Sequence, residues 1–138
     1  MKKKLGFDLD GVLSSQDLPT LYALDDLKKK DHDAWLEIVM DYFAGQIPLM
    51  TEHLFNGDRL VIITARDKDF ELLTRFWLDF YYGDNYDLYC VGYDKNTAKR
   101  KVEIMKENNI GKFVDDNKKW IDTIREYGIE GIHWEIEQ

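Results

Sequence analysis

The chain has 138 residues and a formal net charge of −8 at pH 7, and 44% of its residues are hydrophobic and 14% aromatic. This length supports one compact domain with its own core, and the apolar content excludes a disordered chain. An acidic protein repels a polyphosphate backbone, so long nucleic acids are disfavoured as partners.

Cys90 is the single cysteine, so no intrachain disulfide can form, and it fits a buried apolar residue better than a nucleophile. No apolar run is long enough to cross a bilayer. Asp8 and Asp10 interrupt the apolar stretch that a secretory signal would need. We therefore expect a cytoplasmic protein with no membrane partner.

The first predicted strand, Leu5 to Phe7, leads directly into Asp8-Leu9-Asp10-Gly11. Asp and Gly are ordinary turn residues, so these acids alone fit a turn about as well as a catalytic site. Residues 14–55 follow as an insert, and because it comes directly after the first strand we expect a small helical cap over the carboxyl end of the sheet. The insert carries an apolar stripe typical of core packing: Trp35, Ile38, Val39, Tyr42 and Phe43.

After the insert, predicted strands alternate with predicted helices. Strand patterns cover residues 60–63, 86–92, 113–114 and 131–136, and helical patterns cover residues 70–80, 98–109 and 120–127. The first helix repeats apolar residues at helical spacing: Phe70, Leu73, Phe76, Trp77 and Phe80. Asn117 and Gly128 fit the two caps of the last helix. The pattern predicts an α/β fold, a Rossmann-like three-layer sandwich with a mostly parallel sheet, in a single domain of residues 1–138.

Polar residues stand where the predicted strands end. Thr64 follows the strand 60–63, Asp115-Asp116 follows the strand 113–114, and Lys101 lies near the start of the helix 98–109. Acids from two strand ends can share one divalent cation with oxygen ligands, as magnesium prefers. A hydroxyl and a lysine can then hold the oxygens of a phosphoryl group. These residues therefore indicate phosphoryl transfer, in which positioning and charge neutralisation do most of the catalytic work.

Alternative roles stay open for several of these residues. Lys95 or Lys99 could reach the site in place of Lys101, and Thr64 could instead cap the following helix. Arg66-Asp67, directly after Thr64, fits either a substrate contact or a surface salt bridge.

Taken in order, Asp8-Leu9-Asp10-Gly11-Val12, Thr64, Lys101 and Asp115-Asp116 resemble the four motifs of the haloacid dehalogenase-like (HAD) superfamily. Residues 101–117 resemble the third and fourth motifs of its nucleotidase-like phosphatases. The resemblance covers nearly the whole chain apart from the insert. It implies a phosphatase of small phosphomonoesters, with a nucleotide as the favoured substrate. Aromatic residues of the insert could stack a base: Tyr22, Trp35, Tyr42 and Phe43.

The resemblance also implies catalytic roles for the matching positions. Asp8 would be the nucleophile that forms an aspartyl-phosphate. Asp10 would protonate the leaving group and then activate water. Thr64 and Lys101 would hold the oxygens of the transferred phosphoryl group.

A magnesium site is implied at the same place. The carboxylates of Asp8 and Asp116 and the backbone carbonyl of Asp10 would ligate Mg²⁺, with Asp115 as a ligand through water or as a positioning residue.

Three other functions stay open: a phosphatase of polynucleotide ends, a phosphotransferase with an acceptor other than water, and a catalytically silent binding module. The acidic charge argues against the first, and the presence of all four motifs argues against the last.

Overall fold

The computed structural model describes residues 4–15, 27–44, 49 and 59–134. Within this part of the chain five strands form one sheet in the order β3-β2-β1-β4-β5, and every neighbouring pair is parallel. The strands are β1 (Lys4–Phe7), β2 (Leu60–Thr64), β3 (Tyr86–Cys90), β4 (Ile110–Asp115) and β5 (Glu130–His133). The predicted α/β, Rossmann-like fold is confirmed.

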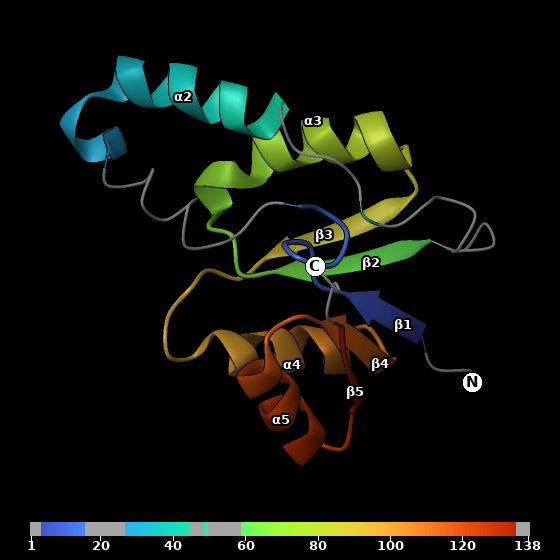
Figure 1. Ribbon diagram of the computed structural model, residues 1–138. Coiled ribbons are helices and arrows are strands. Elements are labelled where there is room, and N and C mark those ends of the chain that lie inside the picture. Colours follow the sequence, from blue (N-terminus) through green and yellow to red (C-terminus); the bar gives the residue numbers. More distant parts are fainter. Residues whose placement is uncertain (1–3, 16–26, 45–48, 50–58, 135–138) are drawn as a thin grey trace.

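Helices cover both faces of the sheet (Figure 1). The helices are α2 (His32–Ala44), α3 (Glu71–Tyr82), α4 (Thr97–Glu107) and α5 (Lys118–Glu126), with a short 3₁₀ turn, η2 (Lys68–Phe70). Helices α2 and α3 lie on one side of the sheet, and α4 and α5 lie on the other. Parallel strands need such crossovers, because the chain must return to the same end of the sheet before each strand. None of the described helices is both long and apolar enough to pass through a lipid bilayer.

The strand order reverses beside β1. The chain proceeds from β1 to β2 and β3 on one side and then returns to place β4 on the other side of β1. Phe7, the last residue of β1, is the register partner of Val114, which comes just before the last residue of β4, so Asp8 and Asp115 lie side by side. In open α/β sheets, ligands bind beyond the carboxyl ends of the strands at this reversal point. The fold therefore brings Asp8 and Asp115 to the place where a ligand site is expected.

Strand β2 is buried along its whole length and contributes to a core on each face of the sheet. Leu60 and Ile62 belong to the cluster on the α3 side, whereas Val61 and Ile63 belong to the cluster on the α4 and α5 side. Successive side chains of a strand point to opposite faces, which explains the continuous apolar run in this strand.

Helix α3 is confirmed, but it does not bury all of its predicted apolar stripe. Trp77 and Leu78 are buried in the core, whereas Phe76 and Phe80 are 77% and 78% exposed, as is Leu72 at 79%. The helix carries apolar residues around more of its circumference than one contact with the sheet can cover. Spacing alone could not show which side faces the sheet.

A matched pair of substitutions tests this orientation of α3. We expect Leu78→Ala to lower the free energy of unfolding by about 2–5 kcal/mol, because it leaves a cavity in the core. Leu72→Ala makes the same chemical change at an exposed position of the same helix and should change it by no more than about 0.5 kcal/mol. Urea unfolding measures both values, and equal losses would show that α3 is rotated from the orientation described.

The described part of the insert packs on the α3 side of the molecule. Trp35 of α2 is buried, and its ring centroid lies 6.4 Å from that of Phe70. Lys28 lies over the Trp35 ring at 4.9 Å from its centroid and pairs with Asp69 at 3.1 Å. As a core residue Trp35 cannot stack a base, in contrast to the role considered for it. Ile38 is exposed rather than core. Tyr22 and the side chains of Val39, Tyr42 and Phe43 lie outside the described residues, as does half of the predicted cap.

Candidate active site

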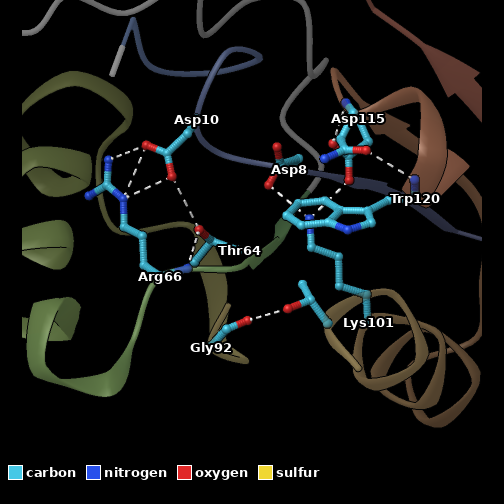
Figure 2. Close-up of polar contacts among 10 residues, drawn as sticks. Asp8, Asp10, Thr64, Arg66, Gly92, Lys101, Asp115 and Trp120 are labelled. Carbon is cyan, nitrogen blue, oxygen red and sulfur yellow. Dashed lines mark hydrogen bonds and ion pairs between the residues drawn. The ribbon is translucent and has the colours of Figure 1, made fainter. Parts of the chain in front are cut away.

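Lys101 joins two acids from neighbouring strands at the carboxyl edge of the sheet. It projects from the first half of α4, and its Nζ donates to Asp8 Oδ1 at 3.0 Å and to Asp115 Oδ2 at 2.9 Å (Figure 2). All three side chains are fully buried. Lys95 and Lys99 are exposed, so Lys101 is the lysine of this segment that meets Asp8.

Two aromatic rings lie close to the Lys101 ammonium. Its Nζ lies 4.5 Å from the centroid of the Trp120 ring and 5.4 Å from that of Phe113. A cation over an aromatic face is attracted by the ring quadrupole, most strongly for tryptophan and when water is excluded. The apolar spacing of the last predicted helix gave no sign that Trp120 reaches the site.

Asp8, Asp115 and Asp116 form an acidic cluster in which one carboxylate oxygen of each lies within 4.8 Å of the others. Asp8 Oδ2 is buried and makes no hydrogen bond within the described part of the chain. Leaving a buried charged oxygen unpaired is costly. An unpaired carboxylate oxygen beside further acids therefore fits a cation that prefers oxygen ligands.

The two oxygens of Asp115 are already occupied. Oδ2 accepts from Lys101, and Oδ1 accepts from the backbone N–H of Asn117 at 3.0 Å. Asn117 in turn accepts from the backbone N–H of Trp120 at 3.1 Å, which confirms it as the N-cap of α5. These bonds favour Asp115 as the residue that orients Lys101 and leave Asp8 and Asp116 with the better placed cation-binding oxygens.

Gly11 allows Asp116 to approach the loop that follows β1. Its φ of 82° lies in the left-handed region, which side chains other than that of glycine rarely adopt. A Cβ at this position would also overlap the carboxylate of Asp116. A side chain at position 11 would therefore strain the turn and would also displace the Asp116 carboxylate.

The pKa shifts follow from burial and from the crowding of like charges. Burial raises the pKa of Asp8 well above its usual range, the charge of Asp115 raises it further, and Lys101 opposes both. Desolvation and the charge of Asp115 raise the pKa of Asp116 to about 6. Desolvation alone would lower the pKa of Lys101, but Asp115 and Asp8 outweigh it and the pKa is raised. If all three carboxylates are ionised, the single ammonium leaves two negative charges uncompensated, which is the charge that one divalent cation supplies.

Asp10 is held by Arg66 in a second buried pair. Arg66 Nε donates to Asp10 Oδ2 at 3.1 Å, and Nη2 donates to Oδ1 at 2.6 Å. The third guanidinium nitrogen, Nη1, donates to Thr74 Oγ1 at 2.8 Å, and that hydroxyl donates to the carbonyl of Phe70 at 2.6 Å. Arg66 is therefore neither at the surface nor directed at the acidic cluster. It ties the loop after β1 to the start of α3.

Figure 2 shows the Asp10 carboxylate turned toward Arg66 and away from Asp8. Burial raises the pKa of Asp10, and Arg66 opposes this shift through its charge and its hydrogen bonds. Thr64 is also buried on this side: its hydroxyl lies 3.5 Å from Asp10 Oδ2 and accepts from the backbone N–H of Arg66 at 3.1 Å. The expected site residues thus form two adjacent groups, Lys101 with the acidic cluster and Arg66 with Asp10 and Thr64.

Cys90 lies at the end of β3 and is half-buried. Burial, followed by the charge of Glu71, raises the pKa of its thiol to about 11. The thiolate is the nucleophilic form of cysteine, and at neutral pH this residue remains a thiol. Its environment does not resemble that of a reactive cysteine.

No protein-family model matches this sequence, and no curated protein is similar to it. The class of protein is therefore defined by its own fold and site. It is an α/β protein with a parallel sheet and a buried acid–lysine cluster where the strand order reverses.

Proposed function

We propose that the protein is a Mg²⁺-dependent phosphatase of small phosphomonoesters that works through an aspartyl-phosphate on Asp8. The observation that carries the proposal is the buried contact of Lys101 with Asp8 and Asp115, beside a second oxygen of Asp8 that has no partner among the described residues. The same residues resemble the HAD motifs, and that resemblance favours a nucleotide as the substrate.

The transfer uses Asp8 and Asp10 in sequence. A carboxylate oxygen of Asp8 attacks phosphorus, the bond from phosphorus to the leaving oxygen breaks, and that oxygen takes a proton from Asp10. Water then attacks the phosphorus of the aspartyl-phosphate and gives a proton back to Asp10, the bond from phosphorus to the Asp8 oxygen breaks, and inorganic phosphate and the Asp8 carboxylate are released. Both oxygens of Asp10 are bonded to Arg66, so this role requires Asp10 to exchange at least one of these bonds for the substrate.

Lys101 supports the attack from within the site. Its ammonium, 3.0 Å from Asp8, favours the ionised nucleophile against the effect of burial and can meet the phosphoryl oxygens as they arrive. Asp115 keeps the ammonium in place. Asp8 and Asp116 would hold Mg²⁺, together with the backbone carbonyl of Asp10. When bound, the ion neutralises charge on the phosphoryl oxygens.

Release of phosphate from p-nitrophenyl phosphate tests the proposal. We expect turnover with Mg²⁺ and none in excess chelator. Thermal unfolding measures the binding of Mg²⁺ independently of turnover: Mg²⁺ at 100 times its Kd should stabilise the protein by about 2.7 kcal/mol. Asp116→Asn should lose most of this gain, whereas the exposed control Asp33→Asn on α2 should keep it. Stabilisation by Mg²⁺ without turnover of any phosphomonoester would contradict the phosphatase and favour a silent binding module.

A further inference from the structure

An open cleft of about 330 Å³ lies at the carboxyl edge of β2 and β3, beside the candidate site. Its walls are the segment after β2, including Asp67 and Lys68, and the loop from β3 into α4, including Tyr93, Asp94 and the Arg100 side chain. Figure 1 shows these two segments leaving the same end of the sheet, one toward α3 and the other toward α4. The volume is within the range of small-molecule sites, about 300–1,000 Å³.

The cleft is connected through the backbone to Thr64 and Lys101, the two residues that the HAD resemblance implies would hold the phosphoryl group. Cys90 lines the cleft and is the register partner of Thr64 in the sheet. The backbone N–H of the next residue, Val91, donates to the Thr64 carbonyl at 2.9 Å. Arg100, on the opposite wall, directly precedes Lys101. A phosphoryl group beside Asp8 would thus have the rest of its molecule next to this cleft.

The α4 wall of the cleft is preorganised by hydrogen bonds. Arg100 Nη1 pairs with Asp94 Oδ1 at 3.0 Å, and Nε donates to the carbonyl of Val91 at 2.6 Å. The hydroxyl of Thr97 donates to the carbonyl of Gly92 at 2.8 Å and accepts from the backbone N–H of Asp94 at 2.8 Å. A wall fixed in this way loses little conformational entropy when a ligand binds.

Tyr93 provides the aromatic surface of the cleft. Its side chain is 50% exposed, and its ring meets Trp120 edge to face, with 5.9 Å between the centroids. Trp120 is the residue whose ring covers the Lys101 ammonium. Tyr93 therefore connects the cleft to the candidate site through its contact with Trp120.

The charges that line the cleft balance. Asp67 and Asp94 oppose Lys68 and Arg100, so the lining has no net charge and does not favour a second phosphate on the substrate. The Asp67 carboxylate is exposed and can accept from hydroxyl groups. The aromatic ring suits a ligand with a planar ring, and the polar groups suit a ligand with hydroxyls. Because the charges balance, the cleft suits a leaving group that is neutral.

We propose, resting on the phosphatase function above, that this cleft holds the leaving group of the substrate and selects a nucleoside, with Tyr93 stacking on the base. This assigns the base to the β3–α4 loop of the sheet domain. The aromatic residues of the insert are not needed for this contact.

Kinetics with two substrates test the assignment: a nucleoside 5′-monophosphate and ribose 5-phosphate, which lacks only the base. Removing a stacked aromatic typically weakens binding of a base by about tenfold or more. We expect Tyr93→Ala to raise the KM for the nucleotide about tenfold and to leave the KM for ribose 5-phosphate unchanged. Tyr93→Phe, which keeps the ring, should behave as the wild type.

A second measurement needs no variant. Unphosphorylated nucleoside should inhibit hydrolysis of ribose 5-phosphate by the wild type competitively, because its base holds it in the cleft and its ribose then takes the place of the substrate's ribose. Failure to inhibit, or equal effects of Tyr93→Ala on both substrates, would overturn the assignment of the cleft and leave the phosphatase standing. Absence of Mg²⁺-dependent turnover of either substrate would instead contradict the phosphatase function on which the assignment rests.

Discussion

Replacing Asp8 with asparagine should abolish phosphate release without weakening the fold. The amide cannot act as the nucleophile, and loss of a covalent nucleophile costs about four orders of magnitude or more in kcat. The same change removes a buried charge that crowds against Asp115 and has one oxygen without a partner among the described residues. In the absence of metal we therefore expect a free energy of unfolding at least equal to that of the wild type. Steady-state kinetics and urea unfolding measure the two effects.

Asp84→Asn is the matched control for this result. Asp84 is exposed in the turn before β3, at the end of the sheet opposite the candidate site, so the same chemical change should alter neither activity nor stability. Full turnover by Asp8→Asn would rule out the covalent mechanism. A large loss of stability in Asp8→Asn would show that Asp8 is held in the structure by more than Lys101.

The residues of the acidic cluster could be anticipated because each stands next to an unmistakable structural signal. The apolar runs before Asp8 and before Asp115 predict strands, and parallel strands leave their next residues at one edge. Helical spacing puts Lys101 near the start of the helix that precedes the Asp115 strand. Each step depends on residues close in sequence, so the sequence predicts Asp8 and Asp115 at one edge of the sheet with a lysine of the 95–101 segment near them. The contacts of Lys101 and the exposure of Lys95 and Lys99 decide which lysine it is.

The partner of Asp10 and the buried side of α3 depend on contacts between distant residues. A buried arginine needs an acid, but nothing near Arg66 in the sequence selects Asp10 over other acids. Similarly, Phe76 and Trp77 are adjacent aromatics, and only the position of the helix against the sheet decides that Trp77 is buried. Trp120 illustrates the same limit, since its ring covers a lysine from another helix.

Replacing Arg66 with alanine should destabilise the protein by about 3–5 kcal/mol at neutral pH, because it leaves the buried carboxylate of Asp10 without its cation. It also removes the donor to Thr74 that ties the loop after β1 to α3. Urea unfolding measures the loss. Arg66→Met combined with Asp10→Asn removes both charges and keeps most of the volume, so it should recover a large part of the lost stability.

The loss caused by Arg66→Ala should grow with pH. Burial raises the pKa of Asp10 and Arg66 opposes that shift. Without Arg66, the pKa of Asp10 in the folded protein is therefore higher still. As pH rises above the usual carboxyl value of 3.8, Asp10 loses its proton in the unfolded chain but keeps it in the folded protein. The free energy of unfolding therefore falls with pH until the pKa of Asp10 in the folded protein is passed. The deficit relative to the wild type should therefore be larger at pH 8 than at pH 5. A deficit independent of pH would mean that Arg66 acts by filling space, and that the charge of Asp10 does not need it.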